Sequence, residues 1–442
     1  MQPARVTLAG YLQLVRSNHN FRRLWLAQIV SEIGDWFYSV AIFSFLLDTV
    51  GTAESVAFAF LCQVLPQTLV SPAAGVINDR LSRRRVMLFA DWSRVVIVGC
   101  MLLVRGRDTV WLLYTLLVLE TVMWALFEPG RSAVIPNIVP ECDIPAANAL
   151  SSTTWSVNFM VGSALGGLVA TRYGRDTVFV LNSLSFAASA LLIWRMRFSE
   201  PHSERGHLRA ADLLGLQPVR EGIAYVRKDP RRLAVMLVKT GLGLMGTNWV
   251  IIPLLGERVF RVQLSGYNAR QAGTMGMSVL LAARGLGALI GGFAATGFAG
   301  NSSRRLRSVI FAGFLLGAAG YCGLSVAPHA VLAVAALIVA HAGGSGIWVC
   351  STTLLQQLTH DRFRGRVFSV EFAFLMFTVG AAGYAAGFAV DHGVGVRAMA
   401  LITGIAMLLP AGLWGLAQRL WVTDLSTSAT PDRLTPSERH EQ

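Results

Sequence analysis

Long apolar runs separated by short polar or charged segments make up most of this chain. A bilayer core of about 30 Å needs about 20 apolar residues per helix, and only helices and closed barrels satisfy every backbone polar group in lipid. The runs lack the alternation of a membrane strand, so each one predicts a spanning helix. Six runs precede a polar break, at residues 22–49, 53–77, 86–104, 109–134, 147–170 and 177–195. Six follow it, at residues 233–255, 272–297, 308–326, 330–356, 367–391 and 397–420.

The polar break divides the chain into two parts that resemble each other. Arg22-Arg23-Leu24 opens the first run, as Arg231-Arg232-Leu233 opens the seventh. A duplicated six-helix unit explains this similarity. We expect an all-helical membrane protein with twelve transmembrane helices. Its predicted parts are a six-helix half at 1–195, a cytoplasmic loop at 196–232, a second half at 233–420 and a disordered cytoplasmic tail at 421–442.

Composition supports lipid as the solvent for most of the chain. Hydrophobic residues make up 54% and charged residues 14%, whereas soluble domains carry about 25% charged residues. The net charge of +13 comes from arginines placed between apolar runs, without the aromatic and basic pattern of a nucleic-acid groove. The five cysteines lack metal-ligand spacing, and no phosphate loop or nucleophile elbow is present. The sequence therefore predicts no enzyme, no metal, no cofactor and no nucleic-acid partner.

The distribution of cations predicts the orientation in the membrane. Only eight of the 38 lysines and arginines fall in the loops that share a side with residues 50–52. Most of the others fall near the two termini, in the central break and in the loops on the same side as the termini. Because Lys and Arg accumulate in cytoplasmic loops, both termini should be cytoplasmic, in a multi-pass protein of the cell membrane surrounded by its lipids.

The loop after the second run carries a recognisable motif. It reads GVINDRLSRR, from Gly75 to Arg84, and resembles the major facilitator loop motif, with Ser82 in place of a glycine. Segments that resemble the macrolide-efflux branch of drug/proton antiporters are Gly34-Asp35-Trp36, residues 136–150, residues 221–230 and the segment Arg364-Gly-Arg366-Val. The resemblance covers residues 20–420. It implies two six-helix halves with a substrate site between them, and a gate in which Asp79 faces the eleventh helix.

The fifth run carries small residues at helical spacing. Gly162, Gly166 and Gly167 are similar to the antiporter motif of drug exporters, with Ser163 where that motif has proline. Small residues four apart let two helix backbones approach closely, which is a packing role before it is a transport role. Both interpretations remain open at the level of sequence.

Acidic residues inside the apolar runs are the candidates for proton coupling. An ionisable residue at the bilayer centre costs at least about 2.5–3.5 kcal/mol on insertion scales, so it needs a partner, a cavity or a function. Glu32 and Asp35 lie three residues apart on one helical face and could place two carboxylates on a central cavity. Glu120 is a third candidate. Alternatively, Glu32 or Asp35 pairs with Arg284 for stability.

Further candidates fall into two sets. Aromatic and basic side chains near the middle of the runs could contact a hydrophobic or amphipathic substrate, and these are Trp36, Trp124, Trp249, Arg284 and His341. A lone histidine beside several glycines is also typical of helix packing. The second set could form gating contacts near the cytoplasmic side, and it comprises Gly75, Asp79, Arg80, Arg83, Arg84, Glu128, Arg366 and Glu371.

Together these patterns predict a secondary transporter that exports an amphipathic, macrolide-like small molecule in exchange for protons by alternating access. Two other functions remain open. One is a carrier for a physiological metabolite such as a siderophore or lysolipid, and the other is a receptor or scaffold that does not transport.

Overall fold

The computed structural model describes residues 8–200 and 217–421, and within these ranges the chain forms helices and short connections, without strands. Six long helices lie in the first range: α2 (His19–Thr49), α3 (Ala53–Arg80), α4 (Arg83–Cys100), α5 (Val110–Ile138), α6 (Ile144–Tyr173) and α7 (Arg175–Trp194). The second range contains α10 (Pro230–Leu242), α11 (Asn248–Arg258), α12 (Ala269–Ala299), α13 (Ser303–Val326), α14 (Ala330–Leu358), α15 (Asp361–Asp391), α16 (Val396–Ala406) and α17 (Leu408–Ala417). Two short helices, α1 (Leu8–Ser17) and α9 (Gln217–Val226), precede these two sets.

Eleven helical segments of the described residues are long and apolar enough to cross a membrane. They include all the predicted spans except the fifth, which corresponds to α6. This helix is 30 residues long, but its first half is rich in Ser, Thr and Asn, which lowers its hydropathy. Three of these polar side chains are buried, namely those of Ser151, Thr154 and Asn158, and so is that of Ser163 in the second half. The polar face of α6 therefore points into the protein.

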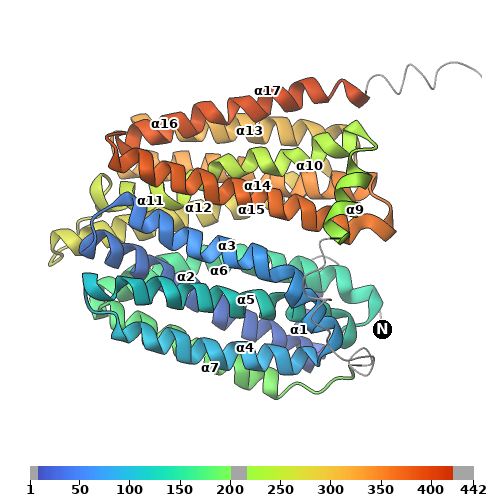
Figure 1. Ribbon diagram of the computed structural model, residues 1–442, viewed down its shortest axis with the longest axis horizontal. Helices are drawn as coiled ribbons and strands as arrows, with labels where there is room; N and C mark the ends of the chain where they lie inside the picture. The colour runs from blue at the N-terminus through green and yellow to red at the C-terminus, as the bar shows by residue number, and fades with distance from the viewer. Residues whose placement is uncertain (1–7, 201–216, 422–442) are drawn as a thin grey trace, which may run out of the picture.

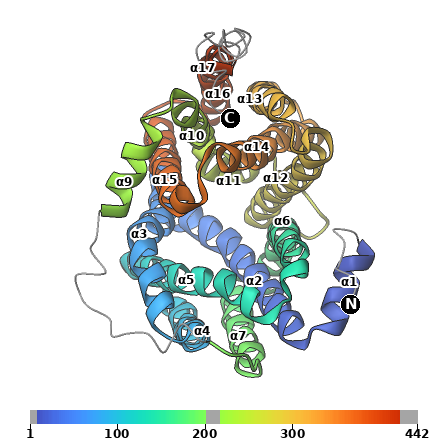
Figure 2. The ribbon, with the colours of Figure 1, turned by 90° about the vertical axis from the view of Figure 1, so that its right-hand side faces the viewer.

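The helices form an elongated bundle in two groups (Figure 1). Helices α1–α7 lie in the lower part of this view and α9–α17 in the upper part. Viewed along the bundle, α3 lies beside α15 and α6 lies beside α12 (Figure 2), and these two pairs make the main contacts between the groups. Helices α2 and α11 also contact the other group, between the two pairs. Residues midway along α2, α6, α11 and α12 therefore meet at the centre of the bundle.

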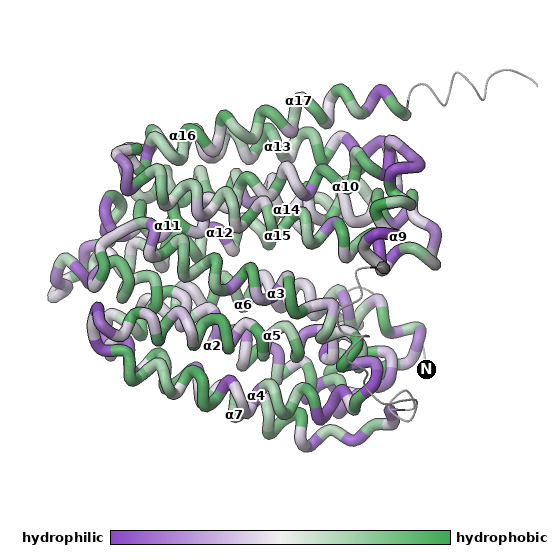
Figure 3. Tube along the Cα trace, in the orientation of Figure 1, coloured by the Kyte–Doolittle hydropathy of each residue, from purple (hydrophilic) through white to green (hydrophobic). Residues whose placement is uncertain are grey.

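The two ends of the bundle differ in what they carry. Both the start of α1 and the end of α17 lie at one end, on the right of Figure 1, which we call the terminus end. The other end, which carries the turns at residues 50–52, 259–268 and 392–395, is called the opposite end. Hydrophilic residues gather at both ends, whereas hydrophobic residues dominate along the helices (Figure 3). This distribution fits an apolar layer between two polar surfaces.

Two of the expected continuous helices are interrupted. The run predicted at 233–255 consists of α10, a 3-10 turn η5 (Gly243–Thr247) and α11. A Cβ at Gly243 or Gly246 would collide with Thr378 or with the backbone of Val379 in α15. Close packing on α15 therefore accompanies the change in helix geometry. The run predicted at 397–420 is likewise divided, into α16 and α17, which meet at Met407.

The central segment is more ordered than the predicted loop. Helix α9 lies within it and packs on α15, where Gly222 is close to the backbone carbonyl of Arg366. An amphipathic pattern too short to span the bilayer explains why a search for apolar runs misses this helix. Arg205 and Arg209 of the same segment, and the predicted tail after Trp421, lie outside the described residues.

Candidate functional site

Five aromatic side chains form a cluster at the centre of the bundle, between the two groups of helices. The aromatic cluster consists of Trp36 of α2, Phe60 of α3, Trp155 and Phe159 of α6, and Trp249 of α11. The rings of Trp36 and Trp249 are stacked, with centroids 6.1 Å apart, and Trp36 meets Phe159 edge-on at 4.2 Å. Phe60 also stacks on Trp249, with the ring centroids 4.9 Å apart. Both groups of helices thus contribute to one apolar surface.

Arg284, midway along α12, lies against this cluster. Its guanidinium carbon is 4.0 Å from the ring centroid of Trp249 and 4.5 Å from that of Phe159. The atoms Nε and Nη1 are buried without a hydrogen-bond partner. Cation–π contacts contribute about 2 kcal/mol when desolvated, whereas removing a charge from water costs several times that amount in a dry interior. The aromatic rings therefore hold this cation without neutralising it.

A first polar network connects Glu32 to α5 and α6. The carboxylate of Glu32 accepts hydrogen bonds from Gln28 at 2.9 Å and from Asn158 at 2.8 Å. The side-chain oxygen of Gln28 in turn accepts one from Arg131 at 3.1 Å, and Arg131 forms an ion pair with Glu128. Glu32 is therefore linked to α5 through neutral amides, with Arg131 as the nearest cation that acts on it.

A second network surrounds Asp35, on the α4 and α5 side of α2. Its electrostatic neighbours include Glu120 and Arg94, and its Oδ1 is buried without a hydrogen-bond partner. Glu120 accepts a hydrogen bond from the hydroxyl of Tyr38 at 3.1 Å. Arg94 is paired with Asp91 and is fully buried, as the spacing of these two residues in α4 suggests. Two carboxylates, Asp35 and Glu120, thus share the field of one arginine that already has an acidic partner.

Glu32 and Asp35, expected on one helical face, have different hydrogen-bond and ion neighbours, although the charge of Glu32 still acts on Asp35. They are on the same helix, but the first contacts the Gln28–Arg131 network and the second lies with Glu120 and Arg94. Neither carboxylate forms an ion pair with Arg284 in this structure, so the alternative of a stabilising pair across the bundle is not realised here.

Two further polar contacts lie inside the second group. Lys239 of α10 forms an ion pair of 2.8 Å with Glu371 of α15, and these side chains are 5% and 2% exposed. This pair is internal, whereas the sequence suggested that Glu371 reaches the arginine-rich loops. His341 lies within hydrogen-bond distance of the hydroxyl of Tyr321, 3.2 Å away, and both are buried. Trp124, the remaining substrate candidate, is half-buried on α5 and lies outside the aromatic cluster.

The motif from Gly75 to Arg84, which joins α3 to α4, forms hydrogen bonds with other helices at the terminus end. Arg83 donates to the backbone carbonyl of Ala133 at 2.8 Å, and Arg84 donates to the carbonyls of Ile193 and Trp194. The carbonyls of Ile193 and Trp194 belong to the last turn of α7, where the helix dipole favours a cation, and Ala133 lies near the end of α5. Asp79 is 74% exposed and lies 3.7 Å from Arg83. The contact of Asp79 with the eleventh helix therefore stays a prediction.

The other gate candidates have different surroundings. A Cβ on Gly75 would meet nothing within 4 Å. Arg80 closes α3 and is half-buried. Arg366 forms an ion pair of 2.7 Å with Glu221 of α9, and Glu128 pairs with Arg131 of its own helix. Their gating roles are not decided by these contacts.

The glycines of α6 face two different helices. A Cβ on Gly162 would press on Trp36 and Ile33, and one on Gly166 would press on the backbone of Phe37, both in α2. Gly167 faces α12 instead, where Ser278 donates a hydrogen bond to the carbonyl of Ser163. Helix α6 is therefore packed tightly between α2 and α12, which places Phe159 against Trp36 and Arg284.

Hydrogen bonds and ion pairs between the two groups gather at the opposite end. Asp391, the last residue of α15, accepts hydrogen bonds from the backbone N–H groups of Ala53 and Glu54 at 2.8 and 2.7 Å. Asp48 of α2 forms an ion pair with Arg270 of α12. Further bonds join Ser44 to Thr274, Gln271 to the carbonyl of Thr171, and Arg258 to the carbonyl of Gly51. These contacts close the bundle at that end.

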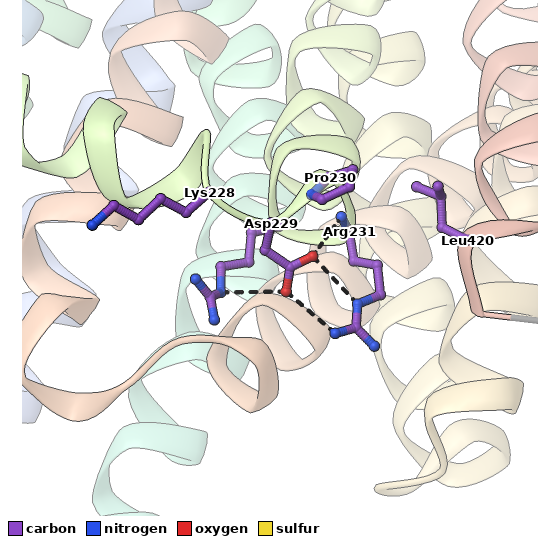
Figure 4. A pocket seen from close by; sticks show the side chains of 6 residues that line it. Lys228, Asp229, Pro230, Arg231 and Leu420 are labelled. Atoms are coloured by element: carbon purple, nitrogen blue, oxygen red, sulfur yellow. Dashed lines mark hydrogen bonds and ion pairs between the residues drawn. The ribbon is translucent and has the colours of Figure 1, made fainter. Parts of the chain in front are cut away.

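Two pockets lie at the surface, away from the aromatic cluster. One, of about 390 Å³, is lined by Lys228, Asp229, Pro230, Arg231, Arg232 and Leu420 (Figure 4). Burial works against the ionised carboxylate of Asp229, but hydrogen bonds from Arg231 hold its pKa below the usual range. Asp229 also caps α10, so this group has a structural task at the helix start. The other pocket, of about 470 Å³, is at the opposite end beside Asp48 and Arg270.

Sequence reasoning missed several residues of the site. Phe60, Trp155 and Phe159 belong to the aromatic cluster, and Gln28, Tyr38, Arg131 and Asn158 belong to the polar networks. The polar residues in α6 were a usable signal, because amides within a spanning helix need internal partners. The aromatic residues gave no such signal, since rings are common in apolar runs.

Comparisons with known proteins agree with this architecture. The family model described as transmembrane secretion effector matches residues 14–440. Macrolide efflux protein A of Streptococcus pyogenes is 24% identical over 358 residues, which cover 79% of this chain and 84% of that protein. An MFS-type transporter of Mycobacterium tuberculosis is 26% identical over 377 residues, covering 81% and 82% of the two chains. Two MFS-type transporters of Bacillus subtilis, 22% and 24% identical, match over only 53% and 56% of their own lengths.

Solved transporter structures share the fold. The nucleoside transporter NupG superposes with a TM-score of 0.68 at 13% identity, covering 90% of this chain and 99% of that one. A bacterial homologue of the lysosomal transporter Spinster, in an inward-facing and unoccupied conformation, gives a TM-score of 0.68 at 14% identity, covering 94% and 98%. Given the eleven spanning helices and the family match over nearly the whole chain, the protein is a multi-pass membrane protein that belongs to the transmembrane secretion effector family of major facilitator transporters.

Proposed function

We propose that this protein exports amphipathic small molecules in exchange for protons, by alternating access at the centre of the bundle. One observation carries the proposal: a central aromatic cluster built by both groups of helices lies beside an unneutralised arginine, and its Trp36 is on the same helix, α2, as two acids. Substrate and proton sites that share a helix can influence each other's occupancy.

The proposed transporter has twelve spans arranged as two halves. Helix α6 supplies the twelfth span, because it is 30 residues long and the polar side chains of Ser151, Thr154, Asn158 and Ser163 are buried within the bundle. The halves are α2–α7 and α10–α17, each of which packs mainly within itself. The terminus end is cytoplasmic, as the arginines of the loops there favour.

The structure is consistent with a state open toward the cytoplasm. Ion pairs and hydrogen bonds between the groups gather at the opposite end, from Asp48–Arg270 to Asp391 at the start of α3. The Spinster homologue with a similar fold was solved in an inward-facing conformation. Rocking of the halves would break these contacts and release substrate outside.

Asp35 is the proposed proton carrier. Its carboxylate lacks a hydrogen-bond partner at Oδ1 and lies in the field of Glu120, while Arg94 is shared with Asp91. A second acid nearby disfavours two simultaneous negative charges, so proton uptake at one of them is favoured. Glu32, held by two amide groups, is the second candidate.

The macrolide efflux proteins among the relatives support an organic, amphipathic substrate. Rings from both halves could stack on an apolar body, while polar groups nearby bind its head. A carrier for a physiological metabolite with the same amphipathic character is the alternative within this mechanism.

Accumulation of fluorescent and macrolide-type compounds in cells tests the proposal. Cells that produce the protein should accumulate less of a substrate than cells without it. A proton uncoupler should abolish the difference, and Asp35→Asn should reduce it at least tenfold while the amount of protein in the membrane stays unchanged. Export that persists in Asp35→Asn and Glu32→Gln would exclude these acids as carriers. Unchanged accumulation across the whole panel would contradict drug export and favour the metabolite carrier.

A further inference from the structure

Arg284 differs from the other interior cations in having no acid beside it. Arg94 pairs with Asp91, Arg131 with Glu128 and Lys239 with Glu371. Among the described residues, the groups in electrostatic contact with Arg284 are Tyr321 and His341, neither of which is an acid. The charge at the centre of α12 is thus unmatched within this conformation.

The aromatic neighbours of Arg284 do not accept the hydrogen bonds that a carboxylate would accept from it. The guanidinium lies over the rings of Trp249 and Phe159, which meet its faces. Its N–H groups point within its plane and need oxygen acceptors. Nε and Nη1 are buried and have none. The arginine therefore offers N–H donors that suit an oxyanion, with apolar rings around them.

We propose that the substrate is an amphipathic anion whose carboxylate or similar oxyanion binds Arg284 while its apolar body lies along the aromatic cluster. This inference rests on the proposed transport function and specifies its substrate class. The anionic group supplies the missing counter-charge and accepts the free N–H groups, preferably in the two-point geometry that suits a guanidinium. Rings of Trp36, Trp155 and Trp249 offer an extended surface to the body.

Other substrate charges fit this site less well. A cationic head beside Arg284 would meet repulsion in an environment with little screening. A neutral head would leave the charge of Arg284 without a counter-ion. Glu32 and Asp35 could attract a cation, but Arg131 and Arg94 are the cations that act on them, and both acids are assigned to their own networks.

Binding of three fluorescent probes with one apolar body tests this inference without requiring transport. The probes are pyrenebutyrate, pyrenebutanol and pyrenebutylamine, which carry a carboxylate, a hydroxyl and an ammonium group. Energy transfer from tryptophan to pyrene is measured with the full-length protein in lipid nanodiscs. Arg284→Gln removes the charge, Arg284→Lys retains it, and Arg261→Gln removes an exposed cation at the opposite end.

The wild type should bind the carboxylate about tenfold more tightly than either other probe, as expected for charge-assisted hydrogen bonds. Arg284→Gln should abolish this preference, Arg284→Lys should retain part of it, and Arg261→Gln should leave it unchanged. Equal binding of the three probes, preference for the amine, no carboxylate binding, or a preference that survives in Arg284→Gln would overturn the inference. Proton-dependent export of neutral or cationic drugs without anion binding would overturn the inference and leave the proposed function intact. Arg284-dependent anion binding without any transport would support the anion site and contradict the proposed function.

Discussion

Charged side chains inside the bundle differ in what balances them. Lys239 and Glu371 form an ion pair of 2.8 Å. Arg284 is instead in contact with aromatic rings, and Asp35 lies in the field of Arg94, which also acts on other acids. Replacing both members of a buried ion pair by apolar groups costs the protein little stability. Replacing only one member leaves an unpaired charge buried away from water, which is strongly destabilising. Stability measurements can therefore separate structural charges from functional ones.

Replacing one member of the Lys239–Glu371 pair should destabilise the protein more than replacing both. Lys239→Met leaves the carboxylate of Glu371 unpaired, and we expect a loss of about 3–5 kcal/mol. The double variant Lys239→Met/Glu371→Leu should recover most of this loss. Thermal unfolding in detergent, followed by tryptophan fluorescence, measures the order of the Tm values. Arg105→Met, at the exposed pair with Asp176, is the control and should change Tm much less. A double variant no better than the single one would contradict this account.

At the scale of the helix, close packing places the site residues. Helix α6 lies between α2 and α12, and its glycines allow the backbones to approach where larger residues would not fit. The 3-10 turn η5 interrupts the seventh span just before Trp249. A change from α-helix to 3-10 geometry often marks a hinge, so Trp249 is well placed to move with α11.

Two glycine-to-alanine substitutions should differ in effect although both lie inside helices. In Gly166→Ala the new Cβ would approach the backbone of Phe37 in α2, which cannot yield without moving a helix. We expect a destabilisation of about 1–3 kcal/mol from overpacking. Gly75→Ala has open space around the new methyl group and should stabilise slightly through helix propensity. Unfolding in the same detergent compares the two, and equal Tm values would show that α2 and α6 are not tightly packed there.

For the whole molecule, the contacts at the opposite end are expected to set the balance between two conformations. The carboxylate of Asp391 caps the first N–H groups of α3, so it joins the two groups of helices through a cap that ordinarily lies within one segment. An exposed cap of this kind contributes about 1 kcal/mol. Such an amount shifts a conformational equilibrium roughly fivefold.

Asp391→Ala, which removes both acceptor oxygens, should therefore shift the protein toward a state open at the opposite end. Arg107 and His392 are exposed, one on each group of helices, and are replaced by spin-labelled cysteines in a background without other cysteines. Double electron–electron resonance then measures the distance between the two labels. We expect a larger population at long distances in the variant than in the wild type. Asp108→Ala, at an exposed acid of the same end, serves as the control. Identical distance distributions in variant and wild type would remove Asp391 from the closing contacts.

Much of the fold followed from the order of residues along the chain. Runs of about 20 apolar residues predict spanning helices because the bilayer offers no hydrogen bonds, and eleven of them meet that description in the structure. The loop motif after α3 identified the superfamily, which the family match confirms. Local rules were less successful at the interruption in the seventh span and at α9, because both depend on contacts with α15.

By itself the sequence determined the class of protein, most of the helices and several side chains that meet at the centre of the bundle, among them Trp36, Trp249 and Arg284. Only the tertiary structure decided which side chains meet. Asp35 joined Glu120 and Arg94 from other helices, Glu32 joined Asn158, and Arg284 lay on rings from α6 and α11. The physical reason is that the cost of burying a charge can be read from one position, whereas its compensation depends on side chains brought close by helix packing.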